Sequence, residues 1–181
     1  MTLPFDFMDR RPIVIAVAGS NGAGKSTFFE SFLADSGLRF INADVLSHSL
    51  EISAYEASRL ATALRTALVA QRASFIFETV LSDPVGEKVE QLRSYSACGY
   101  TVVLIFIDIE TPDESIRRVA MRVTQGGHDV PDEKLVQRFQ RTRRNLERAI
   151  LCLPHVIVYN NHDLSQPYKF VALFQDGQRI A

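Results

Sequence analysis

A short run of residues near the N-terminus has the types and the spacing that suit the binding of a polyphosphate. Gly19 is followed, after four residues, by Gly24, Lys25 and Ser26, and an apolar run over 13–18 comes directly before them. Glycines let successive backbone N–H groups turn toward an anion without a clash of a Cβ atom, and a helix that starts there points its positive end at the same anion. The spacing therefore predicts a phosphate-binding loop between a strand and a helix.

The side chains of this loop have separate expected roles. Lys25 can reach the β- and γ-phosphates of a nucleoside triphosphate, and the hydroxyl of Ser26 can coordinate Mg²⁺. The alternative is a chance glycine-rich turn, but the motif follows a predicted strand and opens a predicted helix, as its mechanism requires. The residues expected to bind the nucleotide are Gly19, Ser20, Asn21, Gly22, Ala23, Gly24, Lys25, Ser26 and Thr27.

Length and charge limit the kinds of partner that the chain can have. A chain of 181 residues suits one domain, 1–181, with a sizeable core. A formal net charge of −1 gives no overall attraction to nucleic acid or to an anionic membrane. No apolar stretch is long enough to span a bilayer, and the first residues do not resemble a signal peptide. We therefore expect a cytoplasmic protein that acts on a small molecule, without a nucleic acid or a membrane as partner.

Strand-like and helix-like segments alternate along the chain, which favours a parallel α/β sheet. The expected strands are 13–18, 39–42, 74–78, 100–108 and 155–160. The expected helices are 25–34, 54–72, 85–97, 112–124 and 132–151. A short C-terminal hairpin is expected over 168–174 and 178–180. The predicted fold is therefore a three-layer α/β fold, with a central, mainly parallel sheet of five strands and helices on both of its faces.

Polar residues follow the predicted strands at the edge where ligands of such sheets bind. Asp44 comes after the second strand and is the candidate general base for a substrate hydroxyl, unless it only caps a short helix that begins at Val45. Glu78 ends a very apolar strand, where it could hold Mg²⁺ through water, bind the acceptor substrate or pair with a neighbouring cation. Thr79 could donate a hydrogen bond to the same ligand. We therefore expect Asp44, Glu78 and Thr79 to contact the substrate.

The fourth and fifth predicted helices carry arginines on faces that do not carry their apolar stripes. A loop with two glycines, 126–128, joins the helices and would let 112–150 close as a lid over the nucleotide. A guanidinium group suits charge that is spread over phosphate oxygens. For any single arginine, the alternative is a solvated helix face or a salt bridge. We expect Arg122 and Arg138 to contact the transferring phosphoryl group, and Arg141 to be the next contact with the nucleotide.

Taken together, several segments in this order resemble the zeta-toxin family of small kinases, over about residues 12–162. They are the phosphate-binding loop, Phe40-Ile41-Asn42-Ala43-Asp44, Phe77-Glu78-Thr79, the segment from Arg122 to Pro131 with Gly126-Gly127-His128, Arg138 with Arg141, and Asn145-Leu146. The resemblance implies a P-loop kinase fold with ATP and Mg²⁺ as cofactors. It also implies phosphorylation of the 3′-hydroxyl of UDP-N-acetylglucosamine and restraint by an antitoxin protein. By the same resemblance Asp44 would be the base, Lys25 and Ser26 would hold ATP and Mg²⁺, and Arg122 and Arg138 would clamp the γ-phosphate.

The leading hypothesis is therefore an ATP-dependent kinase for a small-molecule hydroxyl, with UDP-N-acetylglucosamine as the favoured acceptor. A kinase for another sugar, nucleotide or cofactor hydroxyl is the alternative within the same class. An NTP-hydrolysing switch without an acceptor is the alternative from another class. The sequence has neither an Asn-Lys-x-Asp motif for guanine nor the Leu-Ser-Gly-Gly signature of transport ATPases, which counts against the switch.

Overall fold

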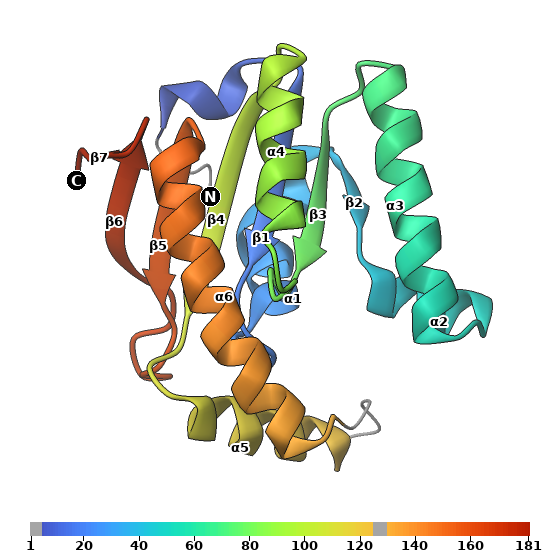
Figure 1. The fold of residues 1–181 in the computed structure, drawn as a ribbon, viewed down its shortest axis with the longest axis vertical. Coiled ribbons are helices and arrows are strands. Elements are labelled where there is room, and N and C mark those ends of the chain that lie inside the picture. The colour runs from blue at the N-terminus through green and yellow to red at the C-terminus, as the bar shows by residue number, and fades with distance from the viewer. Residues whose placement is uncertain (1–4, 125–129) are drawn as a thin grey trace.

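The computed structural model describes residues 5–124 and 130–181. Within these residues one sheet has the strand order β2-β3-β1-β4-β5-β6-β7 (Figure 1). The first five strands pair in parallel, and β6 and β7 continue the sheet as an antiparallel hairpin. The strands are β1 (Ile13–Ala18), β2 (Arg39–Ile41), β3 (Phe75–Thr79), β4 (Thr101–Asp108), β5 (His155–Asn160), β6 (Lys169–Gln175) and β7 (Gln178–Arg179).

Helices cover both faces of this sheet, which gives three layers (Figure 1). The core on one face includes residues of α3, α4 and α6, and the core on the other includes residues of α1 and the 3₁₀ helix η1. The α-helices are α1 (Lys25–Phe28), α2 (Ala43–Leu50), α3 (Ala54–Ala70), α4 (Glu87–Ala97), α5 (Pro112–Val123) and α6 (Asp132–Cys152). The shorter helical segments are the 3₁₀ helix η1 (Asp6–Asp9), the π-helical η2 (Phe29–Leu33) and the 3₁₀ helix η3 (Ala34–Ser36).

The central strands are buried on both faces, as expected where helices cover a sheet from both sides. Every residue of β1 is buried. Val14 and Ala16 belong to the core beneath α3, α4 and α6, whereas Ile13 and Ile15 belong to the core beneath α1. The residues alternate because successive side chains of a strand point to opposite faces. The unbroken apolar run before the phosphate-binding loop is therefore the middle of the sheet.

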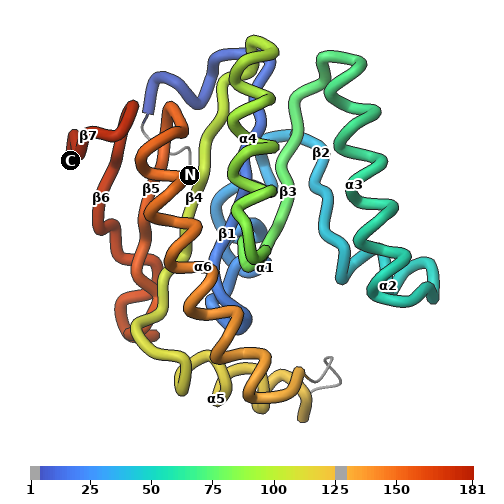
Figure 2. The backbone as a smooth tube through the Cα atoms, in the orientation of Figure 1, coloured from blue at the N-terminus to red at the C-terminus, as the bar shows by residue number. Residues whose placement is uncertain are grey.

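Local sequence sets the starts of two helices near the ligand-binding edge. The Thr111 side chain accepts a hydrogen bond from the backbone N–H of Glu114 at 3.2 Å, and Pro112 occupies the first position of α5. Ser53 and Glu56 form a capping box at the start of α3. The backbone trace in Figure 2 shows that α5 and the first turns of α6 lie beyond the carboxyl ends of the parallel strands. The helices α5 and α6 therefore border the edge where ligands bind.

The predicted α/β fold with a mainly parallel central sheet is confirmed, but the predicted number of five strands is wrong. The expected C-terminal hairpin is present, and its first strand, β6, pairs with β5 instead of standing apart from the sheet. An unpaired β5 would leave a row of open backbone N–H and C=O groups at the edge of the sheet, and β6 covers them. Ala172 and Leu173 of β6 are buried. The hairpin therefore brings the sheet to seven strands within the described residues.

Two helical segments also differ from expectation. The helix expected over 25–34 changes from α-helix to π-helix after Phe28 and ends with a 3₁₀ turn at Ser36. The helix α2 is additional, since the sequence suggested only that a short helix could begin at Val45. Among the residues that the structure describes, no helix is both long enough and apolar enough to cross a membrane.

Candidate active site

The loop between β1 and α1, residues 19–24, has the backbone that its glycines predict. Gly19 and Gly22 have φ angles of 147° and 75°, which residues with a side chain rarely adopt. A Cβ atom at Gly19 would overlap the carbonyl oxygen of Ile107 at the end of β4. At Gly22 it would lie 2.9 Å from the Cβ of Arg118. The loop therefore lies against β4 and α5 more closely than any side chain would allow.

Five consecutive carbonyl groups of this loop accept hydrogen bonds from side chains. These bonds run from Lys25 Nζ to Ser20 O (3.0 Å), Ser115 Oγ to Asn21 O (2.7 Å), Arg118 Nη1 to Gly22 O (3.4 Å), Asn161 Nδ2 to Ala23 O (2.8 Å) and the Tyr168 hydroxyl to Gly24 O (2.9 Å). A carbonyl oxygen repels an anion, whereas a backbone N–H attracts one. The side chains hold the carbonyl oxygens of the loop against the protein. This arrangement suits a loop whose backbone N–H groups bind phosphate.

Arg118 joins α5 to the segment that follows β5. Its Nη2 donates to the carbonyl oxygens of Asn161 at 2.8 Å and of His162 at 3.0 Å. Its Nε donates to the carboxylate of Glu114 at 2.5 Å. Burial alone would raise the pKa of Glu114, but the hydrogen bond and the charge of Arg118, together with the charge of Arg117, lower it. The resulting ion pair holds the guanidinium of Arg118 beside the phosphate-binding loop.

Glu78, at the end of β3, links the phosphate-binding loop to the neighbouring strand connection. Its Oε2 accepts hydrogen bonds from Ser26 Oγ at 2.8 Å and from Asn42 Nδ2 at 2.7 Å. Its Oε1 lies 3.7 Å from the Nζ of Lys25. Burial lowers the pKa of Lys25, while the charges of Glu78 and Asp44 raise it in part. The predicted residues Lys25, Ser26, Asp44 and Glu78 therefore lie close together.

Asp44 lies on the first turn of α2, and its carboxylate is exposed. The alternative that Asp44 caps this helix is wrong, because Asn42 caps it. The Asn42 Oδ1 accepts from the backbone N–H of Asp44 at 2.8 Å and of Val45 at 3.3 Å. The carboxylate of Asp44 is not needed for the cap. The buried Thr79 uses its Oγ1 to accept a hydrogen bond from the N–H of Leu81 at 3.2 Å.

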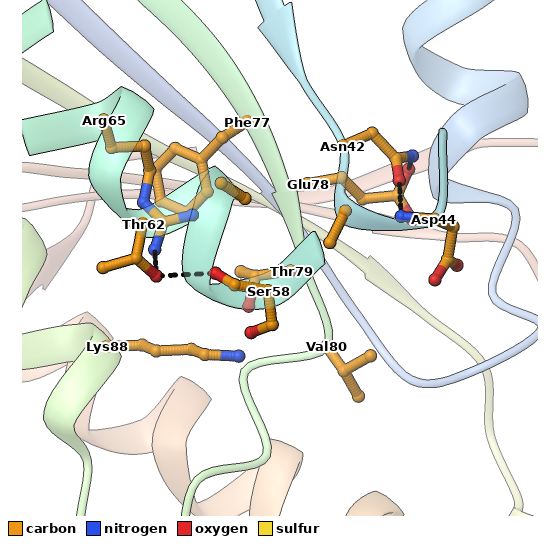
Figure 3. A pocket seen from close by; sticks show the side chains of 12 residues that line it. Asn42, Asp44, Ser58, Thr62, Arg65, Phe77, Glu78, Thr79, Val80 and Lys88 are labelled. Atoms are coloured by element: carbon orange, nitrogen blue, oxygen red, sulfur yellow. Dashed lines mark hydrogen bonds between the residues drawn. The ribbon is translucent and has the colours of Figure 1, made fainter. Parts of the chain in front are cut away.

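A pocket of about 180 Å³ lies beside Glu78, between α2, α3 and the start of α4 (Figure 3). Asp44, Glu78 and Thr79 line it, as predicted for a substrate site. Arg65 of α3 and Lys88 of α4 also line it, and neither was predicted from the sequence. A single arginine or lysine on a helix carries no distinguishing signal, because most such residues lie on solvated faces.

The predicted arginines of α5 and α6 lie at different places around the site. Arg122 lies on α5 one turn after Arg118, which contacts the phosphate-binding loop, and its charge contributes to lowering the pKa of Lys25. Arg138 instead contributes to the lowered pKa of Lys88, on the side of the pocket. Arg141 lies beside Asp83 in the connection between β3 and α4. The predicted hinge loop, 126–128, lies outside the described residues.

The residues around the loop fit a nucleotide with its metal ion. The close approach at Gly19 and the five bound carbonyls shape a cradle for phosphate. The oxygens of Ser26 and Glu78 are of the hard type that Mg²⁺ prefers. Lys25 supplies a buried positive charge next to both.

Comparison with known proteins places the chain in a family. The family model described as "Zeta toxin" matches residues 5–169. This chain belongs to the zeta toxin family. A relative from Haemophilus influenzae, called an uncharacterized protein, is 26% identical over 130 residues, which cover 69% of this chain and 91% of that protein. Zeta toxins are ATP-dependent phosphotransferases, so family membership confirms the predicted enzyme class and the predicted cofactors, ATP and Mg²⁺.

Solved structures show the same fold at low sequence identity. The AvrRxo1-ORF1:AvrRxo1-ORF2 complex with sulphate ions matches with a TM-score of 0.75 at 20% identity, over 95% of this chain and 61% of that chain. The PezAT toxin-antitoxin system of Streptococcus pneumoniae matches with a TM-score of 0.66 at 20% identity, over 91% of this chain and 72% of that chain. This chain thus spans 61% of the length of the AvrRxo1 chain that it matches. The likeness confirms the P-loop kinase fold.

The carbonyl contacts lead to a prediction for nucleotide affinity. Tyr168→Phe removes the hydroxyl that donates to Gly24 O but keeps the ring, which packs edge-on to Phe28 with 5.2 Å between the ring centroids. The net value of such a hydrogen bond is about 1 kcal/mol, so we expect ADP affinity measured by calorimetry to fall about fivefold. Tyr55→Phe, at an exposed tyrosine of α3, is the control and should leave the affinity unchanged. An unchanged affinity in Tyr168→Phe would show that this contact does not shape the loop.

Proposed function

We propose that this chain transfers the γ-phosphoryl group of ATP to a hydroxyl group of a small molecule bound in the pocket beside Glu78. The observation that carries this proposal is the position of Asp44. Its exposed carboxylate lines the same pocket as Glu78, and Glu78 lies 3.7 Å from the ammonium of Lys25 in the phosphate-binding loop. An NTP-hydrolysing switch has no need for an acceptor pocket with a carboxylate at this point.

The nucleotide would be held by the chain's own groups. The backbone amides of 19–24, the ammonium of Lys25 and the hydroxyl of Ser26 would bind ATP and Mg²⁺, which supply the γ-phosphoryl group and a divalent positive charge. Glu78 holds Ser26 through the 2.8 Å hydrogen bond and fixes the direction of its hydroxyl. Glu78 therefore acts mainly as a positioning residue, and it could also accept hydrogen bonds from water on the metal.

Asp44 is the proposed general base. A carboxylate that accepts the proton of the attacking hydroxyl is a recurring part of phosphoryl transfer, and it must lie within hydrogen-bond reach of that hydroxyl. Asp44 fits this role because Asn42, rather than Asp44, caps α2, so the carboxylate of Asp44 is available to the substrate. Thr79, which follows Glu78 in β3 and lines the same pocket, is proposed to contact the acceptor.

Arg122 and Arg138 are proposed to stabilise the charge on the transferring group. They lie on α5 and α6, and their charges contribute to lowering the pKa of Lys25 and of Lys88 respectively. The second half of α6 is fixed, because Thr142 Oγ1 donates to Val80 O at 2.9 Å and Asn145 is buried. Ser115 and Arg118 likewise hold the first part of α5 against the phosphate-binding loop. Closure of the proposed lid would therefore involve only the last turn of α5 and the first half of α6.

UDP-N-acetylglucosamine is the favoured acceptor, since the chain belongs to the zeta toxin family. An antitoxin protein is the proposed partner. Two structural neighbours support it, because one is a complex of two AvrRxo1 proteins and another is a toxin-antitoxin system. A kinase for a different, smaller hydroxyl compound is the second candidate. The pocket of about 180 Å³ favours it, since pockets for drug-sized ligands have volumes of about 300–1,000 Å³. A single domain and a cytoplasmic location remain predictions.

The experiment that tests the proposed function uses purified protein, ATP·Mg²⁺ and UDP-N-acetylglucosamine. We expect ADP and a phosphorylated sugar nucleotide, both identified by mass spectrometry. Asp44→Asn should lower kcat by about 10²-fold or more, because general-base catalysis contributes about 10²–10⁴-fold, while ADP affinity stays unchanged.

Asp113→Asn is the matched control, since Asp113 is also an exposed aspartate on the first turn of a helix. Lys25→Ala sets the background rate. Unchanged turnover in Asp44→Asn would remove this residue from the mechanism. Steady ADP release that no hydroxyl compound accelerates would favour the switch over the kinase.

The two arginines should affect the transition state more than the ground state. Arg122→Ala and Arg138→Ala are each expected to lower kcat by about 10²-fold, with a much smaller change in ATP affinity, because their charge would meet the phosphoryl group during transfer. Steady-state kinetics and calorimetry separate the two effects. Arg144→Ala, at an exposed arginine of α6, is the control. Loss of ATP affinity with an intact kcat would contradict the proposed role.

A further inference from the structure

The pocket beside Glu78 carries two cations on the wall away from the proposed base. Arg65 of α3 and Lys88 of α4 lie on one side of the pocket, and Asp44 lies on the other (Figure 3). None of the proposed steps of phosphoryl transfer uses either cation. Their surroundings therefore need a separate explanation.

Arg65 is a buried cation without an acidic partner. Its side chain is only 9% exposed, and its Cζ lies 4.9 Å from the centroid of the Phe77 ring. Its Nη2 donates to the hydroxyl of Thr62 at 3.0 Å. Within residues 5–124 and 130–181, no carboxylate forms an ion pair with it. Arginines are almost never buried to this extent unless they are paired, because desolvating a charge is costly.

Lys88 is the second unpaired cation. Its ammonium points into the pocket in Figure 3, and no carboxylate of the described residues forms an ion pair with it. Burial lowers its pKa, Asp83 raises it, and the charges of Arg65, Lys25 and Arg138 lower it again. The carboxylate of Asp83 is engaged elsewhere, because Oδ1 accepts a hydrogen bond from the N–H of Glu87 at 2.5 Å.

We propose that Arg65 and Lys88 form a binding site for a phosphate or carboxylate group carried by the acceptor substrate. An anion between them would relieve the repulsion of the two cations and restore the interactions that each lost on burial. The site lies across the pocket from Asp44, so the acceptor has its reacting hydroxyl at one end and its anionic group at the other. This inference rests on the proposed function only in assigning the anion to the phosphoryl acceptor.

Cation-π contact with Phe77 accounts for part of the position of Arg65, but it gives no role to Lys88. A purely structural pair would gain nothing from placing two like charges at the same cavity. An anionic acceptor accounts for both residues, for the burial of Arg65 and for the direction in which Lys88 points.

The test measures anion binding directly, without turnover. The protein is saturated with a non-hydrolysable ATP analogue and Mg²⁺, so that the phosphate-binding loop is occupied, and inorganic phosphate is then titrated by calorimetry. We expect Arg65→Gln and Lys88→Gln each to weaken phosphate binding by about tenfold or more, since each loses a charge-assisted hydrogen bond. Arg59→Gln, at an exposed arginine on the same helix, and Lys169→Gln, at an exposed lysine of β6, should bind phosphate like the original protein.

Arg65→Lys is the control that separates loss of the positive charge from loss of the fold. It keeps the positive charge and should recover part of the phosphate affinity, whereas a purely structural effect would not follow the charge. Unfolding temperatures of all variants are measured in parallel. The proposal is overturned if the original protein binds no phosphate under these conditions, or if both glutamine variants bind it with unchanged affinity.

A second experiment tests whether the anion that binds this site is part of the acceptor substrate. N-acetylglucosamine, N-acetylglucosamine 1-phosphate and UDP-N-acetylglucosamine share every hydroxyl of the sugar ring except the anomeric one, and they differ in charge. We expect kcat/KM to be at least about tenfold higher for an anionic compound than for the neutral sugar, with the loss in Arg65→Gln and Lys88→Gln appearing mainly in KM. Preference for the monophosphate assigns the site to a compact acceptor, and preference for the sugar nucleotide assigns it to the diphosphate.

The outcomes separate this inference from the proposed function. If phosphate binding depends on Arg65 and Lys88 but no hydroxyl compound is phosphorylated, the anion site stands and the kinase function fails. If all three compounds are phosphorylated equally well and KM is unchanged in both variants, the kinase function stands and the assignment of the anion to the acceptor fails.

Discussion

The carboxylate of Glu78 is the contact on which the rest of the candidate site depends. One oxygen accepts hydrogen bonds from Ser26 and Asn42, and the other lies 3.7 Å from the ammonium of Lys25. Asn42 in turn caps α2 and so sets where Asp44 stands. A single carboxylate at the end of β3 therefore connects the phosphate-binding loop to the helix that carries the proposed base. Its position needs β3 beside β1, which follows from the parallel pairing of these two strands.

The conformation of the phosphate-binding loop also depends on residues that are distant in sequence, because their side chains bind its carbonyl groups. The side chains that bind residues 21–24 come from α5 and from the segment after β5, about 90 to 145 residues away in sequence. Glycines make the loop backbone accessible, but they leave its direction open, because a glycine can adopt many conformations. The distant donors restrict that freedom. Ser115 and Arg118 belong to the same helix as Arg122, so the helix that supports the loop also carries an arginine that is proposed to contact the nucleotide.

The sequence predicts the parts of this protein that short-range patterns encode. The glycine spacing, the apolar strands and the polar residues at their ends were enough to place Lys25, Ser26, Asp44 and Glu78 at one edge of the sheet. Pairing between distant segments was not predictable in the same way. The hairpin strand β6 joins β5, and Tyr168 reaches Gly24, through contacts that no local pattern specifies. Arg65 was missed because a helical arginine is ordinarily solvated, whereas tertiary packing buries this one beside Phe77.

The net charge of the whole chain does not reflect the charge of the candidate site. The formal net charge is −1, so no long-range field draws an anion to the protein. The site nevertheless gathers three positive side chains, Lys25, Arg65 and Lys88, around two carboxylates, Asp44 and Glu78. Bringing like charges together in a partly buried space destabilises the empty protein unless ligands supply the missing anions. A site built in this way fits two anionic ligands, a nucleotide at the loop and a charged acceptor across the pocket.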